Sequence, residues 1–304
     1  MSNIQDETFH LISDSSCDLP PELTAEKNIT VVPFYVSFDD EHYERELEEI
    51  KVRDFYQRMV DNPKVYPKTS MPPVQDYIDA FEPIVKTGTP VICICISSKF
   101  SGSYQSAMNA REMVLEEYPQ ARIAVIDATV NTVLQGLYVL EAASLRDGGV
   151  AYEAAIERLE EIKSTGRIFF TVGDMEYLKH GGRIGKVAGL AGSVLGIRPV
   201  IVLKEGEIFP AGIGRSRKST VAKSTDLLLN YLKEEGGGFE RFRLAIGYGY
   251  DYEEAVTLRK QTLEILHERG YEIEDIPIFQ IGAAISVHTG PYALGFGIIE
   301  KAIH

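Results

Sequence analysis

Hydroxyl side chains gather at three places that fit strand ends of a single sheet. The groups are Asp14, Ser15, Ser16 and Asp18 in "ISDSSCDLP", Thr69 and Ser70 in "KTSMPP", and Ser101, Gly102 and Ser103 in "KFSGSYQSAM". Each group alone fits a helix cap or a stiff turn. Together they can converge on one ligand, because open α/β sheets bind ligands along one edge of strand ends. Hydroxyls, a glycine and the amides of a helix N-terminus suit a carboxylate or phosphate, so we interpret this edge as an anion cradle.

The sequence offers little support for catalysis by the chain alone. "SSKFSGSY" does not match the G-x-S-x-G pattern of a nucleophilic serine, and no ordered Ser, Asp and His trio is visible. "GGRIGKVAG" lacks the spacing of the Walker loop and of the dinucleotide fingerprint. None of the six histidines is spaced with Cys, Asp or Glu as a metal-binding pair on one helix face. We therefore expect no metal, and keep a self-sufficient enzyme acting on a small anionic substrate as the alternative to a binding protein.

A glycine-rich stretch, "DMEYLKHGGRIGKVAGLAGSVLGIRPVI", carries a basic cluster at its start. Its glycines are Gly181, Gly182, Gly185, Gly189, Gly192 and Gly196, and its basic residues are Lys179, His180, Arg183 and Lys186. Small residues allow either close helix packing or close approach of a ligand, and both interpretations stay open. His288 precedes a Thr-Gly-Pro turn. It is a hydrogen-bonded structural residue unless it faces the hydroxyl groups from the other side of a domain interface.

The elements expected in the first half alternate between strands and helices. The strands are 9–13, 31–38, 91–97 and 122–127, and the helices are 74–85, 103–118, 132–149 and 151–164. This alternation is typical of βαβ units with a largely parallel sheet. We predict an α/β fold with two domains, of which residues 1–165 form the first, with helices flanking its sheet.

The second half, residues 166–304, has the pattern of a mixed α+β domain. Strands are expected at 167–173, 198–204, 207–212, 243–249 and 276–281, and helices around 219–235 and 251–268. "LKEGEIFP" predicts a hairpin with Glu205 and Gly206 at its tip, so part of this sheet should be antiparallel. With no long linker in the sequence, the two halves should pack closely.

Composition narrows the class of protein. The chain has 304 residues, 44% of them apolar, which suits a globular protein, and its net charge of -14 argues against nucleic acid as a partner. No apolar run is long enough to span a bilayer and the start is polar, so we expect no transmembrane segment and a cytoplasmic location. Of the three cysteines, Cys93 and Cys95 should form a buried structural pair, and Cys17 is unpaired.

Motifs along nearly the whole chain resemble those of the DegV family of bacterial fatty-acid-binding proteins. They are "ISDSSCDLP", "TSMPP", "ISSKFSGSYQSA", "VIDA", "YLKHGGRIG", "IRPVI", "GRSRKS" and "HTGPYALG". The resemblance implies a two-domain α/β protein that encloses one long-chain fatty acid, with the carboxylate near the domain interface. It also implies a carrier role in phospholipid metabolism, without catalysis or a cofactor of its own. A separate ATP-dependent fatty acid kinase subunit would phosphorylate the bound acid to an acyl phosphate, and transient membrane contact would fit lipid exchange.

The resemblance also assigns roles to individual residues. Thr69 and Ser101 would contact the carboxylate with Ser70, Gly102 and Ser103 beside them, His288 would lie near the head group, Arg183 would support phosphoryl transfer, and Arg215 and Arg217 would face the partner. The sequence departs from the family's more usual residues at Met71, Pro73 and Tyr292.

Overall fold

A four-stranded parallel sheet forms the core of the N-terminal half in this computed structural model, which describes residues 8–190, 198–236 and 238–303. The strand order is β2-β1-β6-β7, with β1 His10–Asp14, β2 Ile29–Val32, β6 Val91–Cys95 and β7 Ile123–Asp127. All five residues of β6 are buried, because helices cover both faces of the sheet. Cys93 and Cys95 share one of these faces, with their sulfurs 3.7 Å apart, as the sequence predicts.

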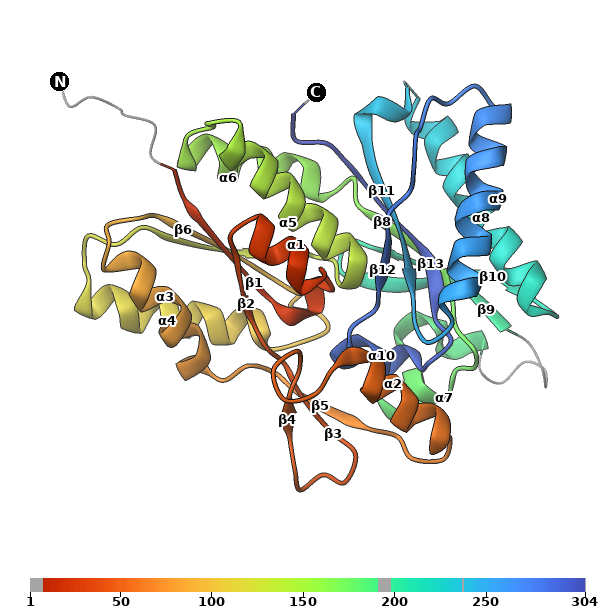
Figure 1. Cartoon of the computed structure of the whole chain (residues 1–304), viewed down its shortest axis with the longest axis horizontal. Helices are drawn as coiled ribbons and strands as arrows, with labels where there is room; N and C mark the ends of the chain where they lie inside the picture. The colour runs from red at the N-terminus through yellow and green to blue at the C-terminus, as the bar shows by residue number, and fades with distance from the viewer. Residues whose placement is uncertain (1–7, 191–197, 237, 304) are drawn as a thin grey trace.

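The N-terminal half contains six described helices. They are α1 Pro21–Glu26, α2 Val52–Asp61, α3 Val74–Val85, α4 Ser103–Glu117, α5 Thr132–Asp147 and α6 Tyr152–Lys163. α3 begins directly after Pro73, as expected for a helix that a proline introduces. α3 and α4 cover one face of the sheet, while α1, α5 and α6 lie on the other (Figure 1).

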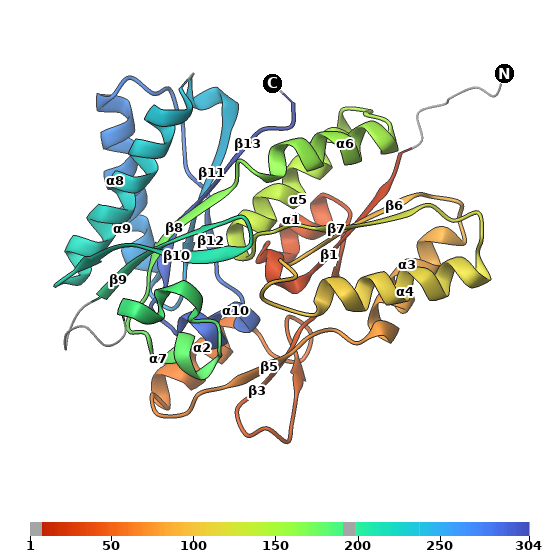
Figure 2. The same ribbon diagram turned by 180° about the vertical axis from the view of Figure 1, so that it is seen from behind.

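The C-terminal half contains a six-stranded mixed sheet with the order β10-β9-β8-β13-β11-β12. Its strands are β8 Arg167–Thr171, β9 Arg198–Lys204, β10 Glu207–Gly214, β11 Phe242–Tyr248, β12 Ile278–Gln280 and β13 Leu294–Glu300. α8 Arg217–Glu235 and α9 Tyr252–Glu268 cover its outer face (Figure 2). The predicted hairpin is confirmed, since β9 and β10 are antiparallel and Glu205 and Gly206 both have positive φ. The α/β fold class with two different sheets is therefore confirmed.

α5 lies between the two sheets. It contacts β1 on one side and β11 and β13 on the other, and nearly all of its residues are buried. This central position joins the two halves in one hydrophobic core, as their predicted close packing requires. The boundary predicted at residue 165 falls between α6 and β8 and stays a prediction.

A third, three-stranded sheet was not predicted. The stretch 31–38, expected as one strand, is split at Pro33 into β2 and β3, which belong to different sheets. Proline has no amide hydrogen to donate to a strand ladder, so pairing ends there. The new sheet has the order β4-β3-β5, with β3 Tyr35–Ser37, β4 Glu44–Arg45 and β5 Lys68–Ser70. It packs near α2, α7 Glu176–His180 and α10 Ala283–Thr289.

β13, which lies inside the six-stranded sheet between β8 and β11, was also not predicted, and neither were the helices α1, α2, α7 and α10. Glycines weaken strand propensity, and β13 contains Gly295 and Gly297. Here packing requires the glycine at Gly295 and favours one at Gly297. A Cβ at Gly295 would lie 2.2 Å from the carbonyl oxygen of Phe169, and one at Gly297 would lie 3.2 Å from the amide nitrogen of Leu134 on α5.

Short 3-10 turns and the ends of the chain complete the fold. The turns are Ser15–Cys17, Gly185–Leu190 and Phe239–Arg241. Gly192 and Gly196 of the glycine-rich stretch lie outside the described residues. Among the residues that the structure describes, no helix combines the length and the apolar character needed to cross a bilayer.

Candidate functional site

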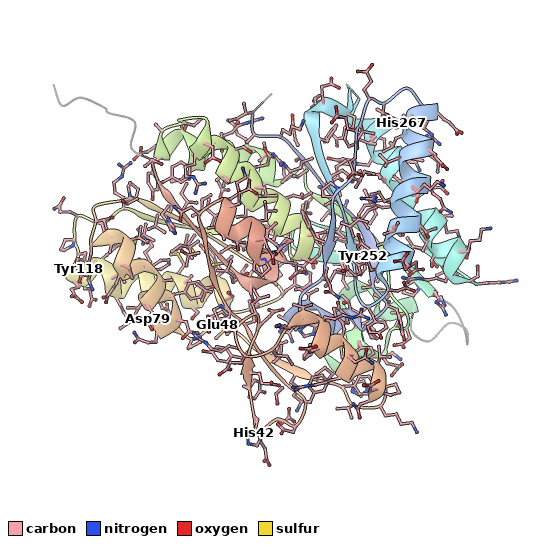
Figure 3. All side chains as sticks on the ribbon, viewed as in Figure 1. His42, Glu48, Asp79, Tyr118, Tyr252 and His267 are labelled. Atoms are coloured by element: carbon pink, nitrogen blue, oxygen red, sulfur yellow. The ribbon has the colours of Figure 1, made fainter. Side chains whose placement is uncertain are left out.

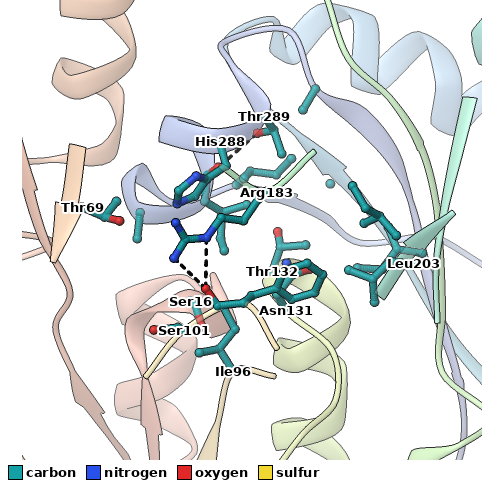
Figure 4. A pocket seen from close by; sticks show the side chains of 18 of the residues that line it. Ser16, Thr69, Ile96, Ser101, Asn131, Thr132, Arg183, Leu203, His288 and Thr289 are labelled. Atoms are coloured by element: carbon teal, nitrogen blue, oxygen red, sulfur yellow. Dashed lines mark hydrogen bonds between the residues drawn. The ribbon is translucent and has the colours of Figure 1, made fainter. Parts of the chain in front are cut away.

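A cavity lies where the carboxyl edge of the parallel sheet meets the inner face of the six-stranded sheet (Figure 4). Its polar lining comes from Ser16, Thr69, Ser101, Asn131, Thr132, Arg183, His288 and Thr289. Its remaining lining is mostly aliphatic and aromatic, including Phe34, Ile96, Phe100, Leu203 and Ile285. A largely apolar cavity with a few placed polar groups suits a ligand that is itself amphipathic.

The polar groups come from segments far apart in the sequence. Thr69 lies on β5, Ser101 precedes α4, Arg183 follows α7 and His288 lies on α10. Figure 4 shows these four residues gathered on one side of the cavity, with Leu203 on the opposite side. With Ser16, which also lines the cavity, the structure therefore brings one member of each of the three predicted hydroxyl groups together with the predicted arginine and histidine.

The inner face of the six-stranded sheet forms the apolar wall. Ile168 and Phe170 alternate with outward-facing Phe169 along β8, as the period of two of a strand requires. Gly247 on β11 is directly opposite Gly295 on β13, and both line the cavity. A Cβ at Gly247 would lie 3.1 Å from Cγ1 of Val133 on α5, so the absence of a side chain there lets α5 approach this part of the sheet.

Arg183 joins the two halves of the chain at the cavity. Its Nε and Nη2 donate to the carbonyl oxygen of Phe100 at 3.1 and 2.9 Å, and its Nη1 donates to Gly181 at 2.8 Å. The other members of the basic cluster are used elsewhere: Lys179 pairs with Glu176, His180 stacks on Tyr66, and Lys186 pairs with Glu207. Of the four, Arg183 alone is part of the cavity lining.

His288 is held against the glycine-rich segment. A Cβ at Gly181 would lie 2.1 Å from the Nδ1 atom of His288, so only glycine allows this approach. Nδ1 is buried and has no hydrogen-bond partner in the described part of the chain. Burial, together with the positive charge of Arg183, lowers the pKa of His288 from 6.5 to about 4. The imidazole is therefore neutral at pH 7.

The lowered pKa of His288 has a consequence for stability. Between the ordinary value of 6.5 and the folded value of about 4, the unfolded chain binds more protons than the folded one. We expect the free energy of unfolding to fall as the pH drops through this window, and to fall less in His288→Gln. Urea unfolding of lipid-free wild type and variant at about pH 7 and about pH 5 measures the difference. An equal loss of unfolding free energy in wild type and His288→Gln would contradict a lowered pKa for His288.

Two predicted ligand contacts lie away from the cavity. Ser70 is exposed on β5. Ser103 is fully buried and donates to Asp14 at 2.7 Å, with the hydroxyl of Tyr77 at 2.6 Å. Gly102 does line the cavity, where a Cβ would lie 2.5 Å from the sulfur of Met71. The binding roles of Ser70 and Ser103 stay predictions, without a place in the cavity lining.

The predicted partner-facing arginines differ from each other. Arg217 forms a bidentate pair with Glu254 on α9, with N···O distances of 2.7 and 2.8 Å. Arg215 is exposed and forms no ion pair with any described residue. Of the two, Arg215 is the one with a free guanidinium.

Three buried carboxyl groups lie beside the cavity, and only Asp14 and Asp18 belonged to the predicted cradle. The third, Glu46, accepts hydrogen bonds from Ser15 and from the amides of Ala283 and Ala284 at the start of α10. Burial raises its pKa to about 7. Burial and the nearby Glu46 raise the pKa of Asp18 well above its usual value.

The residues that the structure describes contain no group of three or more His, Cys, Asp and Glu arranged to hold a metal ion. Figure 3 shows His42 and His267 at opposite ends of the molecule. Sequence reasoning missed Asn131, Thr132 and Thr289 in the cavity lining. The strand-end rule could have found the first two, because they follow β7 just as Ser16 follows β1.

The chain matches a family model, that of the uncharacterised proteins of the DegV family, over residues 8–301. The chain belongs to the DegV family. A DegV domain-containing protein of Clostridium acetobutylicum is 31% identical over 285 residues, which make up 94% of this chain and 95% of the relative.

Solved structures of similar proteins show the same fold. A stearic-acid-binding protein from Eubacterium ventriosum is 42% identical, with a TM-score of 0.92, and the match covers 97% of this chain and 99% of that one. A DegV family protein from Thermus thermophilus, described for its fatty acid binding, is 30% identical with a TM-score of 0.85, and the match covers 96% and 99%. Both of these proteins are thus described as binding fatty acids.

Proposed function

We propose that this protein binds one long-chain fatty acid in the cavity and presents its carboxylate to a separate ATP-dependent kinase subunit. The observation that carries the proposal is the cavity itself, which has hydroxyls, an imidazole and a guanidinium on one side and a hydrocarbon wall opposite. Structures of similar DegV proteins that are described as binding fatty acids support the same ligand class. The protein acts as a carrier and performs no chemistry alone.

The carboxylate lies at the polar end, where Thr69 and Ser101 donate their hydroxyl protons to it and neutral His288 supplies a further N–H. The acyl chain extends along the inner face of the six-stranded sheet, past the cavity-lining residues Gly247 and Gly295. A chain of ~15 methylenes transferred from water at ~0.8 kcal/mol each provides on the order of 12 kcal/mol before the costs of binding are subtracted. A ligand with this driving force survives purification.

Phosphoryl transfer requires a partner. The kinase subunit would bring ATP so that a carboxylate oxygen attacks the γ-phosphorus, forming the acyl phosphate and releasing ADP. Arg183, on the exposed rim of the polar end, can pair with phosphate oxygens through guanidinium donors. Arg215 is a candidate contact to the kinase, whereas Arg217 is held by Glu254.

Lipid analysis tests the ligand class directly. We expect organic extraction of the purified protein to yield a long-chain fatty acid by mass spectrometry, and stearate to raise the melting temperature of delipidated protein. A ligand at 100 times its Kd stabilises a protein by about 2.7 kcal/mol. Stearyl alcohol, which lacks the carboxylate, and butyrate, which lacks the long chain, are the matched controls.

The controls separate the proposal from its alternative. Repeated extraction without any acyl chain, together with an unchanged melting temperature in stearate, would contradict the carrier function. Stabilisation by butyrate equal to that by stearate would instead favour the enzyme acting on a small anionic substrate.

A further inference from the structure

Asp14 is a carboxyl group enclosed at the end of β1, next to a cavity-lining serine. Its side chain is 0% exposed. Oδ2 accepts hydrogen bonds from the amide of Ile96 at 3.0 Å and from Ser103 Oγ at 2.7 Å. Oδ1 lies 2.5 Å from Oγ of Ser16, which lines the cavity, and 2.8 Å from Nε2 of Gln135. No lysine, arginine or histidine of the described residues forms an ion pair with Asp14.

Asp14, Ser16 and Gln135 form a closed ring of three contacts. Besides the two contacts at Asp14 Oδ1, Ser16 Oγ lies 2.8 Å from Gln135 Oε1. Three contacts at hydrogen-bond distance need three protons, one in each. The Ser16 hydroxyl supplies one, and the Gln135 amide supplies one, since its other N–H is directed to Ser13 at 3.1 Å. If Asp14 were ionised, only two protons would be present for the three contacts. One pair of buried oxygen atoms would then face each other without a proton between them, and their lone pairs would repel.

The orientation of the Gln135 amide does not change this count. If the amide is turned over, Nε2 donates to Ser16, and Ser16 can donate to Asp14. Oε1 then faces Asp14 Oδ1 at the distance of 2.8 Å, again without a proton between two oxygens. In both orientations the missing proton is supplied when Oδ1 of Asp14 carries it.

We propose that Asp14 keeps its proton in the folded protein and is a positioning residue for the head-group site. The protonated acid donates within the ring and so fixes Ser16. Through Ser103, whose amide donates to Ser101 Oγ at 3.2 Å, it also fixes the loop that carries Ser101. A neutral acid holds these hydroxyls without setting a negative charge beside the ligand's carboxylate, a final step that rests on the proposed function.

The balance of forces on Asp14 agrees with the count of protons. Burial raises the pKa of Asp14 above its ordinary value, while the hydrogen bonds from Ser16, Ser103, Gln135 and Ile96 lower it, and the net direction is upward. The neighbouring carboxyl groups, Asp18 and Glu46, add no positive charge that would favour ionisation.

Infrared spectroscopy of lipid-free protein with isotope-labelled aspartate tests the protonation state. At neutral pH, we expect the wild type to show a carbonyl band of a protonated aspartic acid that is absent from Asp14→Asn. Ser16→Ala should shift this band, because it removes a hydrogen-bond partner of Asp14 while leaving the acid in place. If the band that Asp14→Asn loses relative to wild type is that of an ionised carboxylate and not that of a protonated acid, the inference is overturned.

Fatty acid affinity tests the positioning role. Asp14→Asn, a neutral side chain of the same shape, should bind stearate within about fivefold of wild type, whereas Asp14→Ala should bind it at least about 10-fold more weakly, because the hydrogen bonds are lost. Equal weakening in both variants would mean that the negative charge is needed, and would overturn the proposal. If Asp14→Ala does not fold, the infrared comparison of wild type with Ser16→Ala still shows whether Asp14 is protonated.

The two readouts keep this inference separate from the proposed function. An acid band for Asp14 in a protein that binds no stearate would leave the protonation intact and remove the fatty acid function. An ionised Asp14 in a protein that does bind stearate would contradict the proposed protonation of Asp14 and leave the fatty acid function standing.

Discussion

Replacing Thr69 and Ser101 together by alanine should weaken fatty acid binding by roughly 100-fold or more. A hydrogen bond to a charged acceptor contributes about 1.5 to 3 kcal/mol, and the double variant removes two of them from one carboxylate. The two residues come from β5 and from the loop before α4, and they line the same side of the cavity. Isothermal titration of delipidated protein with stearate measures the change, and each single variant should show part of it.

Ser98→Ala is the matched control for this experiment. Ser98 lies in the same loop as Ser101, is exposed, and donates to Asp127 away from the cavity lining. Its loss should leave the affinity unchanged. A folded double variant that binds stearate as tightly as wild type would remove Thr69 and Ser101 from the head-group site.

Arg183→Ala should abolish most acyl phosphate formation while the protein keeps its lipid. A guanidinium that stabilises charge during phosphoryl transfer contributes a large rate factor, so we expect turnover with a matching kinase subunit and ATP to fall at least about 100-fold. Lipid retention should change little, since burial of the acyl chain does not require this residue. The measurement compares fatty acid retained on purification with acyl phosphate formed per unit time.

Lys186→Ala provides the control on the same segment. Lys186 is exposed, pairs with Glu207, and is not part of the cavity lining, so its loss should leave both readouts near wild type. Two other results would change the role of Arg183. Joint loss of lipid and turnover would mean that its bonds to Phe100 hold the site together, and full turnover in Arg183→Ala would make it an ordinary surface charge.

The strand and helix pattern of the parallel half could be predicted from the sequence because local signals agree there with the final fold. The helix 74–85 has the observed bounds of α3, where prolines introduce a strongly amphipathic segment. β9 also has its expected bounds, and the tip of its hairpin has turn residues suited to positive φ. In each case the residues of one short segment carry the information.

β13 and the third sheet could not be predicted in this way. The glycines of β13 lower its strand propensity, and their reason is contact with β8 and α5, which lie more than a hundred residues earlier in the chain. β5 is three residues long and exposed in part, so no alternation of apolar and polar residues marks it. β5 is a strand because it pairs with β3, and the sequence of residues 68–70 alone does not indicate that pairing.

The polar groups of the candidate site could be predicted from residue types in the sequence, whereas its apolar wall depends on how the chain folds. Strand-end hydroxyls indicated where an anion would lie, and the structure gathers Thr69, Ser101 and His288 there. The expected position of Thr69 and Ser70 at a strand end of the same sheet was wrong, because both lie within β5 of the three-stranded sheet. The apolar wall arises from the inner face of the six-stranded sheet, whose residues look like ordinary core in the sequence. The proposed proton on Asp14 could not be predicted from the sequence either, because it is inferred from the distances among the side chains of Asp14, Ser16 and Gln135.

The position of α5 between the sheets bears on the order of events during synthesis on the ribosome. α5 is complete at residue 147, but β11 and β13, which cover its second face, begin at residues 242 and 294. Until both strands have been made, part of this apolar helix surface lacks its cover, and we expect chaperones that bind such surfaces to recognise the nascent chain. The cavity, with walls from β8 and β13 as well as the early loops, therefore forms late, and no nascent fragment that ends before β13 has a complete one.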